Sequence, residues 1–205
     1  MKSLELFETR PLEKTLWERG IKRLAGVDEA GRGCLAGPVI AAAVILPPYF
    51  HIEGLTDSKK LSPAQRETLL EQIQDQAIAI GIGQCSPEEI DTLNILWAAM
   101  EAMKRAVDQL PVPPEHLLID GNYCYPECPY PYHTLVKGDL RSQPIAAASI
   151  VAKVTRDRLM QTLHEQYPQY NWAQNKGYPT SAHYEALKKY GPSPLHRTSF
   201  RLTRS

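Results

Sequence analysis

The segment from Gly37 to Leu46 constrains the fold most, because its residues are apolar on both faces of a strand. Such a strand belongs in the buried centre of a sheet. Pro47 and Pro48 end it, since proline cannot donate to a strand ladder and favours a turn. The chain of 205 residues fits one domain and is long enough to bury such a sheet in a substantial core.

Two serines mark the starts of helices. Ser62 and Ser86 are each followed by proline and, three positions after the serine, by Gln or Glu. This pattern is a capping box with proline at the first helical position. The first signal predicts a helix over 63–76. The second predicts the longest helix of the chain, running from Pro87 to about Leu110.

The other elements follow from the same kinds of pattern. We expect a short helix over 10–20, strands over 24–29, 77–83, 116–120 and 133–136, and helices over 145–166 and 181–190. Strands and helices mix, and helices dominate the last part of the chain, which is typical of an α/β fold with a helical C-terminal part. We therefore expect one domain over residues 1–205, with an α/β core over about 20–160 and a helical extension over about 161–205.

The first predicted strand ends in two adjacent carboxylates, Asp28 and Glu29, which Gly31-Arg32-Gly33 follows closely. Carboxylates at the end of a strand bind hard divalent cations, and a glycine turn lets the backbone come close to a ligand. Two neighbouring acids repel each other unless a cation or a proton lies between them. The pattern therefore predicts metal-assisted chemistry on a ligand that the Gly-Arg-Gly turn binds.

Asp120 and Asp139 share this layout, since each follows an apolar, strand-like approach. If neighbouring strands bring them to Asp28 and Glu29, the four carboxylates can hold two Mg²⁺ or Mn²⁺ ions for phosphodiester hydrolysis. Ligand sets made only of oxygen suit these ions better than Zn²⁺. The alternative is that each aspartate only forms a turn or caps a helix. Residues 28 and 29 face opposite sides of a regular strand, so we expect the strand to end or distort there.

The charge is divided unevenly along a chain that is formally neutral. Residues 137–205 hold eleven Lys and Arg against four Asp and Glu, whereas residues 1–136 hold twelve against nineteen. An acidic part rich in candidate metal ligands, joined to a basic part, suits a polyanionic substrate. Ordinary surface asymmetry is the alternative explanation.

The sequence predicts a soluble cytoplasmic protein without a membrane segment. Met1-Lys2-Ser3-Leu4-Glu5 lacks the layout of a secretory signal, and the longest apolar run, from Ala36 to Leu46, is too short to span a bilayer. Cysteines at positions 34, 85, 124 and 128 are scattered, which is typical of reduced thiols.

Gly26-Val27-Asp28-Glu29-Ala30-Gly31-Arg32-Gly33 is the first of several blocks that cover residues 24 to about 200. These blocks resemble the signature of type 2 ribonuclease H, the bacterial ribonuclease HII family. Further blocks follow in the family's order: Leu35-Ala36-Gly37-Pro38-Val39, Asp57-Ser58-Lys59-Lys60-Leu61-Ser62, Ile119-Asp120-Gly121-Asn122, Lys137-Gly138-Asp139, Ala147-Ala148-Ser149-Ile150-Val151-Ala152-Lys153-Val154-Thr155-Arg156-Asp157 and Gly177-Tyr178-Pro179-Thr180. Together these blocks are very specific, whereas a lone Asp-Glu pair would mean little.

The resemblance implies a ribonuclease H-like fold, with a mixed five-stranded sheet flanked by helices and a helical C-terminal extension. It implies an endoribonuclease that cuts the RNA strand of RNA–DNA hybrids and the 5′ side of single ribonucleotides embedded in duplex DNA. The products would carry a 3′-hydroxyl and a 5′-phosphate, and the cofactor would be two Mg²⁺ or Mn²⁺ ions.

The resemblance also implies roles for single residues. The metal ligands and catalytic residues would be Asp28, Glu29, Asp120 and Asp139. The backbone of Gly31, Arg32 and Gly33 would read the 2′-hydroxyl, and Tyr178 would stack on the sugar just past the junction. Phosphates would be held by Lys59, Asn94, Ser149 and Lys153.

Simpler roles compete for several polar residues. We expect Asp57 and Lys60 to pair or to cap a turn, and Asp157 to fix its helix through local ion pairs. Arg197 and Arg201 either touch backbone phosphate or are solvated near the end of the chain. Tyr178, taken without its neighbours, is an ordinary half-buried tyrosine.

The cysteines raise two further questions. Cys124 and Cys128, with His133 nearby, superficially resemble a zinc site, but no fourth ligand is evident and spare thiols are the favoured interpretation. Cys34 stands where proline commonly follows Gly-Arg-Gly in the family. It leaves the glycines intact, and its effect on the turn stays open.

Two other classes of function stay open besides the endoribonuclease. One is a hybrid-binding protein without catalysis, against which the four carboxylates speak. The other is a related nuclease, such as a junction resolvase or a 3′-exonuclease, which needs clustered carboxylates but neither the Gly-Arg-Gly turn nor Tyr178.

Overall fold

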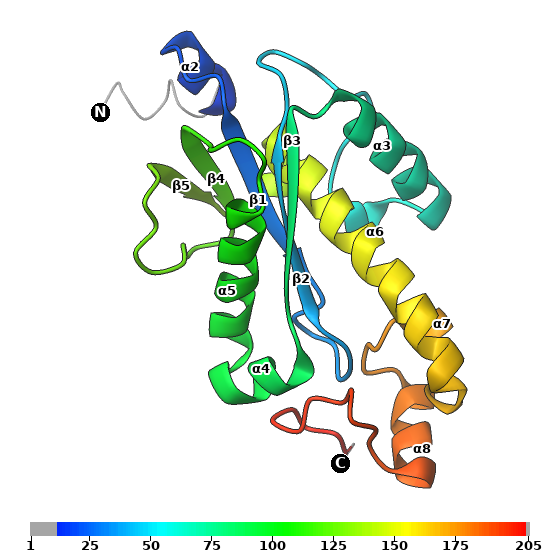
Figure 1. The fold of residues 1–205 in the computed structure, drawn as a ribbon. Coiled ribbons are helices and arrows are strands. Elements are labelled where there is room, and N and C mark those ends of the chain that lie inside the picture. The colour runs from blue at the N-terminus through cyan, green and yellow to red at the C-terminus, as the bar shows by residue number, and fades with distance from the viewer. Residues whose placement is uncertain (1–11, 204–205) are drawn as a thin grey trace.

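A mixed five-stranded sheet forms the centre of the protein, with helices on both of its faces (Figure 1). The computed structural model describes residues 12–203. The strand order is β3-β2-β1-β4-β5, with strands β1 Leu24–Ala30, β2 Val39–Ile45, β3 Ala79–Cys85, β4 His116–Asp120 and β5 Tyr132–Leu135. β1, β2 and β3 pair antiparallel, whereas β4 pairs parallel with both β1 and β5. The predicted mixed five-stranded sheet is therefore confirmed.

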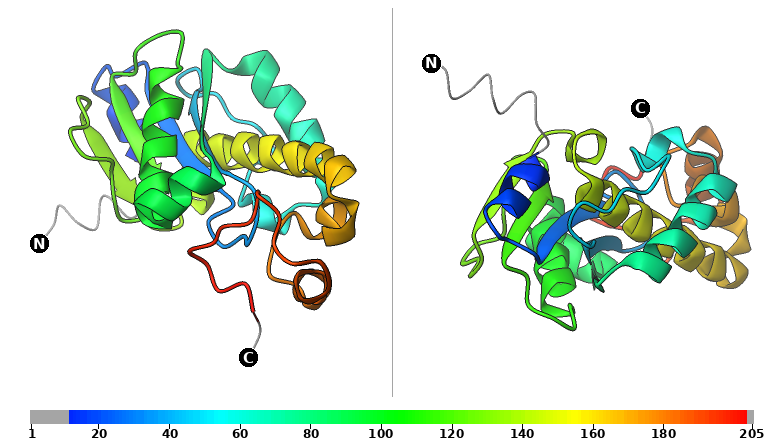
Figure 2. Two further views of the ribbon diagram at one scale, coloured as in Figure 1. Left: turned by 60° about the horizontal axis from the view of Figure 1, so that its bottom comes forward. Right: turned by 90° about the horizontal axis from the view of Figure 1, so that it is seen from above.

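Strand β2 is buried along its whole length, as its apolar sequence predicts. Ala41, Ala43 and Ile45 pack under helix α5 (Ile95–Asp108), whereas Ala42 and Val44 pack under α3 (Pro63–Gln76) and α6 (Gln143–Gln166). Figures 1 and 2 show these helices on opposite faces of the sheet. Small side chains on the strand let helices on both faces lie close to the backbone.

The segment after Ser86 forms two helices instead of the single long helix that the sequence predicts. Helix α4 (Pro87–Leu93) ends at Asn94, which has φ +65°, and α5 begins at the next residue. The side-chain oxygen of Asn94 accepts hydrogen bonds from the backbone N–H groups of Leu96 and Trp97. Asparagine tolerates positive φ and caps helices well, so it restarts the chain in a new direction. The longest helix of the described chain is instead α6, with 24 residues.

Other boundaries match the prediction closely. Helix α3 and strand β4 have the predicted limits, and so does helix α8 (Ser181–Tyr190). Strand β3 starts two residues later than expected, because Ala77 caps the end of α3. Helix α2 covers Leu12–Glu18, and the start predicted at residue 10, like the segment Met1 to Glu5, lies outside the described residues.

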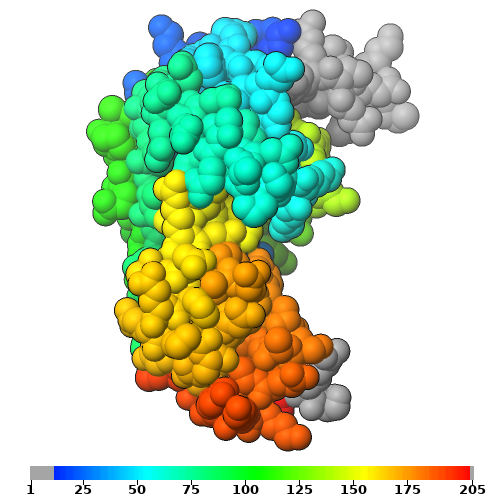
Figure 3. Space-filling model, turned by 90° about the vertical axis from the view of Figure 1, so that its right-hand side faces the viewer, coloured from blue at the N-terminus to red at the C-terminus, as the bar shows by residue number. Residues whose placement is uncertain are grey.

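The C-terminal helices pack on the far half of α6, beyond the sheet. A second core forms there from Leu35, Ala36 and Met160 together with Tyr170 and Trp172. The last two lie in a 3₁₀ turn (Pro168–Tyr170) and in the short helix α7 (Trp172–Asn175), neither of which the sequence predicted. Figure 3 shows α6 between α3 and these C-terminal helices.

The segment after α8 returns to the loop between β1 and β2. Ala36 forms an isolated bridge with His196, and Gly37 donates a backbone hydrogen bond to Leu195. The extension is therefore joined to the end of the sheet at which the Gly-Arg-Gly turn connects β1 and β2. None of the helices within residues 12–203 has the length and apolar character needed to cross a bilayer.

Substituting Gly26 tests how closely α6 lies on β1. A Cβ atom at Gly26 would lie 2.0 Å from the carbonyl carbon of Pro144, in the first turn of α6. Helix backbone cannot move aside cheaply, so Gly26→Ala is expected to lower the free energy of unfolding by about 2–3 kcal/mol. Gly33→Ala is the matched control, because a Cβ there meets no atom within 4 Å. It should change stability by less than about 0.5 kcal/mol in urea unfolding. Equal stability of the two variants would contradict this packing.

Candidate active site

Strands β1 and β4 bring two of the four carboxylates to one end of the sheet. Val27 and Ile119 are paired in the parallel ladder, so the next residues, Asp28 and Asp120, leave the ladder side by side. Neighbouring strands lie about 4.8 Å apart. The parallel register alone therefore places these two carboxylates close together.

The third acidic position reaches the same end by a different route. Asp139 lies in a 3₁₀ turn (Gly138–Leu140) just beyond β5, and not at the end of a strand as the sequence predicts. The side chain of Asp120 holds this turn in place, because its Oδ1 accepts a 2.7 Å hydrogen bond from the backbone N–H of Gly138.

Asp28 and Glu29 lie in a regular stretch of β1, which corrects the expected distortion. Their antiparallel partners in β2 are Ala42 and Ala41, which pack on opposite faces of the sheet. Pairing of β1 with β2 runs on to Ala30, whereas its pairing with β4 stops at Val27. The two carboxylates thus start from opposite faces of the sheet, and both lie near enough to Asp120, the last residue of β4, for its charge to raise their pKa values.

Burial and mutual repulsion raise the pKa values of these acids. Burial raises the pKa of Asp28 well above its ordinary value, and the charges of Glu29 and Asp120 add to this, while a hydrogen bond with Ser149 opposes it. Burial also raises the pKa of Glu29, against the opposing effect of Arg32. A nearby cation would relieve this stored repulsion.

The pKa of Asp139 is raised for the same reasons. Burial comes first among the causes, followed by the charges of Asp57 and Asp120. The four carboxylates therefore form one electrostatically connected group of oxygen donors, which suits a hard divalent cation.

These carboxylates do not yet form a closed ligand set. Within residues 12–203, no three His, Cys, Asp or Glu side chains are gathered at the spacing of a metal site. Protein donors occupy two of the oxygens: Asp28 Oδ1 accepts from the Glu29 N–H at 2.7 Å, and Glu29 Oε1 lies 3.2 Å from Arg32 Nη1. The residue types and charge of the group fit a divalent ion, and ion binding requires these side chains to draw together.

Two buried arginines hold the glycine turn, Gly31 to Gly33. Arg197 is fully buried and donates to the carbonyls of Gly31, Arg32 and Gly37 at 2.8–3.0 Å. Arg197 therefore lies neither in solvent nor on phosphate, and both expectations from the sequence were wrong. Its three donor nitrogens are all engaged with backbone, so its role is to fix the turn.

Arg156 supports the turn from the side of α6. Its guanidinium donates to the carbonyls of Ala36, Pro38 and Lys176 at 2.8–3.0 Å. Gly31 has φ +98°, and a Cβ there would lie 2.1 Å from the Nε atom of Arg156. A glycine is therefore required at this position both by conformation and by space.

Tyr178 stands beside the glycine turn with its side chain partly exposed. Burial raises its pKa, and the neighbouring Cys34 thiol, to which it is hydrogen bonded, raises it further. Cys34 is fully buried, and the backbone N–H of the next residue, Leu35, donates to the carbonyl of Gly177 at 2.8 Å. Cys34 thus joins the turn to the tyrosine.

The residues expected to hold phosphate differ in how near they lie to the carboxylates. Ser149 is hydrogen bonded to Asp28, and its hydroxyl lies 3.0 Å from that of Ser58. Lys59 is close enough to lower the pKa values of Glu29 and Asp139. Lys153 lies one helical turn beyond Ser149, and Asn94 is engaged in capping α5.

The simpler roles foreseen for two acids are confirmed. Asp57 caps the 3₁₀ turn Ser58–Lys60, accepting a hydrogen bond from the Lys59 N–H. Asp157 forms ion pairs with Lys153 at 2.6 Å and Arg66 at 3.6 Å.

Cys124, Cys128 and His133 do not pair with one another as a set of three: the two cysteines of the proline-rich loop contact each other, whereas His133 in β5 pairs with His116 in β4. His133 stacks on His116, with 2.7 Å between their ring nitrogens. Cys124 and Cys128 contact each other, and all four cysteines of the chain are free thiols.

Comparison with known proteins gives a consistent result. The model of the family described as Ribonuclease HII matches residues 25–203. The chain belongs to the ribonuclease HII family. It is 54% identical over 195 residues to ribonuclease HII of Salinibacter ruber, which covers 94% of this chain and 98% of that protein. It is 55% identical over 194 residues to ribonuclease HII of Vibrio vulnificus, covering 95% of this chain and 93% of that protein.

Solved structures agree with this assignment. The crystal structure of ribonuclease H2 from Pyrococcus horikoshii OT3 superposes with a TM-score of 0.71 at 29% identity, covering 87% of this chain and 94% of that one. Membership of the ribonuclease HII family confirms the resemblance found in the sequence and makes this chain an endoribonuclease.

Neutralising Asp28 should stabilise the ion-free protein, because the carboxylate is buried among other acids. A raised pKa means that the folded state binds the proton more tightly than the unfolded chain. This stabilisation is complete below the unfolded pKa and is lost as the pH rises through the folded pKa. At pH 7, Asp28→Asn should therefore melt about 2–4 °C above wild type, which corresponds to about 1 kcal/mol in a chain of this length.

Calorimetry with and without Mg²⁺ checks this prediction. The gap between the two proteins should narrow as the pH falls toward about 4, where wild-type carboxylates take up protons. Mg²⁺ should raise the melting temperature of wild type more than that of the variant. A variant that melts below wild type at pH 7 without ions would show that Asp28 is not destabilised by its neighbours.

Proposed function

We propose that this chain hydrolyses the RNA strand of RNA–DNA hybrids and cuts on the 5′ side of single ribonucleotides embedded in duplex DNA. Cleavage leaves a 3′-hydroxyl and a 5′-phosphate. The observation that carries this proposal is the position of the carboxylate group beside a glycine turn, two of whose carbonyls are bound by buried Arg197. The carboxylates would hold the ions that hydrolyse the strand. The rigid backbone of the glycine turn would recognise the 2′-hydroxyl.

Asp28, Glu29, Asp120 and Asp139 would hold Mg²⁺ or Mn²⁺, with two ions in the substrate complex. Such ions, when bound, activate a water and stabilise charge on the departing oxygen. The side chains supply four carboxylates. Burial first, and then the charge of neighbouring acids, raises the pKa values of Asp28, Glu29 and Asp139, and divalent ions would neutralise this charge. Ser149 orients Asp28, and Asp120 holds the turn that carries Asp139.

The backbone of Gly31, Arg32 and Gly33 would read the 2′-hydroxyl, the group that distinguishes a ribonucleotide from its DNA neighbours. Two features support this role. A Cβ at Gly33 would meet no atom within 4 Å, so the approach to the turn is open. The carbonyls of the first two residues are held by Arg197, so the turn is rigid before substrate arrives.

The partly exposed ring of Tyr178 would stack on the sugar just past the junction. Its contact with Cys34 fixes it relative to the glycine turn, so that the 2′-hydroxyl and the next sugar are read together. Lys59, Asn94, Ser149 and Lys153 would hold phosphates around this centre. The basic C-terminal part of the chain supports binding of a polyanion.

The protein would act as one unit in the cytoplasm, without a membrane partner. The contact between the C-terminal extension and the core supports a single unit, since Arg197 of the extension donates to the Gly31 carbonyl of the glycine turn.

A cleavage assay on three duplexes tests the function. The duplexes contain one embedded ribonucleotide, a continuous RNA strand paired with DNA, or DNA only. We expect cleavage of the first two in Mg²⁺ or Mn²⁺, none without ions, and none of the DNA duplex. Asp120→Asn should lower the cleavage rate by about a thousand-fold or more, since it removes an ion ligand, while duplex binding persists. Full activity of this variant, or cleavage of the all-DNA duplex, would sink the proposal.

Replacing Tyr178 tests how the junction is read. Tyr178→Ala should lower the cleavage rate at a single embedded ribonucleotide by about ten-fold or more, because ring stacking on a nucleotide is worth about 1–3 kcal/mol. The matched control is Tyr190→Ala on α8, since Tyr190 is also exposed and its ring contacts the side chain of Lys189. Equal rates for the two variants on this substrate would remove Tyr178 from recognition.

A further inference from the structure

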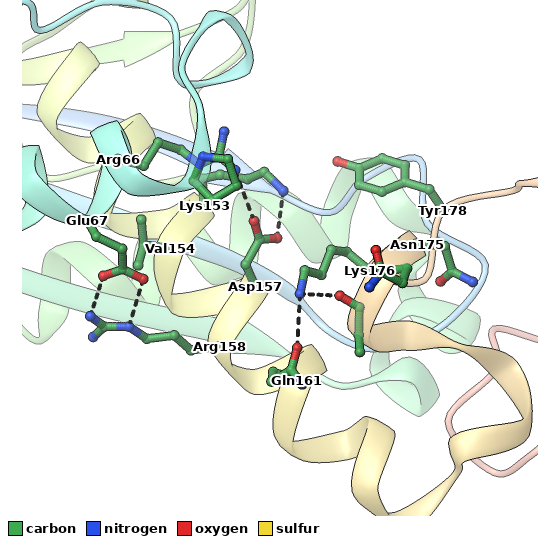
Figure 4. A pocket seen from close by; sticks show the side chains of 13 residues that line it. Arg66, Glu67, Lys153, Val154, Asp157, Arg158, Gln161, Asn175, Lys176 and Tyr178 are labelled. Carbon is green, nitrogen blue, oxygen red and sulfur yellow. Dashed lines mark hydrogen bonds and ion pairs between the residues drawn. The ribbon is translucent and has the colours of Figure 1, made fainter.

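A pocket of about 550 Å³ lies beside Tyr178, between α3, α6 and the segment from α7 to Tyr178 (Figure 4). Of the residues assigned above to substrate, only Lys153 and Tyr178 line it. The other polar and charged side chains of the pocket, Arg66 and Lys176 among them, have no part in the proposed function.

Positive charge dominates the lining of this pocket. Arg158 and Glu67 pair with each other, which leaves Arg66, Lys153 and Lys176 around one further carboxylate. This carboxylate, of Asp157, lies 3.6 Å from Arg66 and 2.6 Å from Lys153. Burial lowers the pKa of Lys176, and the charges of Lys153 and Arg66 lower it further while Asp157 opposes this effect. Three cations that share one acid leave an excess of positive charge, which favours an anion.

Lys176 occupies an unfavourable backbone conformation to reach this position. It is left-handed, with φ 49° and ψ 28°, and it ends α7 where a glycine would be less strained. Its carbonyl accepts a 2.8 Å hydrogen bond from Arg156, which holds the turn in this shape. Its ammonium contacts neutral oxygens, those of Ala173 at 2.7 Å and Gln161 at 3.4 Å (Figure 4). In these two contacts the Lys176 ammonium does not form an ion pair with a carboxylate.

The distance between the pocket and the carboxylate group can be counted along helix α6, which contacts both. Ser149 contacts Asp28, and Lys153 and Asp157 follow on the same face at steps of four residues. With a rise of 1.5 Å per residue, Asp157 lies roughly 12 Å further along the helix than Ser149. A nucleic acid strand carries one charge per about 3.4 Å of its axis, so the pocket lies a few nucleotides from the carboxylates.

We propose that Arg66, Lys153 and Lys176 bind a backbone phosphate of the cleaved strand, a few nucleotides from the cut, on the side of the ribonucleotide where Tyr178 lies. Asp157 keeps the cations in place when no phosphate is bound. This inference rests on the proposed function for the direction of the strand, but the site is defined by its own charges and position.

Duplexes with one neutralised phosphate test this site in the wild-type protein. Each duplex carries one ribonucleotide and a single uncharged methylphosphonate linkage, moved through successive positions of either strand. Affinity is measured without divalent ions, so that no cleavage occurs. One position in the DNA flank of the cleaved strand is expected to lower affinity about three- to ten-fold, since a charge-assisted phosphate contact is lost.

The variant Lys176→Gln links that position to the pocket. It should weaken binding of the unmodified duplex by a similar factor, reduce the salt slope of the affinity by about 0.9, and abolish the effect of the methylphosphonate. Lys176→Asn, which keeps a residue that tolerates the left-handed conformation, should behave alike. Lys104→Gln is the control, because Lys104 is an exposed lysine on α5, on the other face of the sheet, paired with Asp108.

The outcomes separate this inference from the proposed function. The inference fails if no phosphate of the cleaved strand shows a loss that depends on Lys176, or if the only such phosphate lies in the opposite strand. If the loss is found but wild type does not cleave the ribonucleotide duplex in Mg²⁺, the phosphate site stands and the proposed function fails.

Discussion

Repulsion among buried carboxylates is the constraint on which the rest of this structure depends. The parallel register of β1 and β4 places Asp28 and Asp120 side by side, and the charge of Asp120 also raises the pKa of Glu29, which starts from the other face. No hydrophobic gain accompanies this arrangement, since the acids lose water and repel each other. The sheet tolerates them because its centre is tightly packed, with β2 buried on both faces. The stability of the packed core thus offsets the unfavourable burial and repulsion of the acids at one end of the sheet.

The C-terminal extension has a direct part in shaping the site. Arg197 binds the carbonyls of Gly31 and Arg32 from more than 160 positions away in the sequence. His183 on α8 contacts the carbonyl of Tyr178 at 3.0 Å, and its other ring nitrogen lies 3.0 Å from His196. Burial lowers the pKa of His196 to about 4, so this pair stays neutral near pH 7. The glycine turn and the tyrosine are therefore held by one connected set of buried polar groups.

Local signals in the sequence were sufficient for most elements. The capping box at Ser62 sets α3, and the apolar run before Asp120 sets β4, because both depend on residues within a few positions. The break at Asn94 was missed because the serine before it starts a helix correctly and the residues after it remain apolar on one face. The four carboxylates were identified by their types and by family resemblance, and the parallel register explains why Asp28 and Asp120 lie close together.

The supporting groups could not be predicted in the same way. Arg156 and Arg197 bind backbone carbonyls, which carry no side-chain pattern that a sequence displays, and their partners lie far away along the chain. Asp139 was expected at a strand end, but its position comes from a turn that Asp120 holds. The pocket at Lys176 likewise depends on a left-handed residue at the end of α7, in a conformation that glycine usually takes there.

The most direct test of the central claim is to locate the ions themselves. Crystals of the protein bound to a duplex with one ribonucleotide, grown with Mn²⁺, would reveal each ion by its anomalous scattering. The account predicts peaks in direct contact with the carboxylates of Asp28 and Asp120, with Glu29 and Asp139 completing the ligands. Peaks bound elsewhere, with none between Asp28 and Asp120, would contradict it.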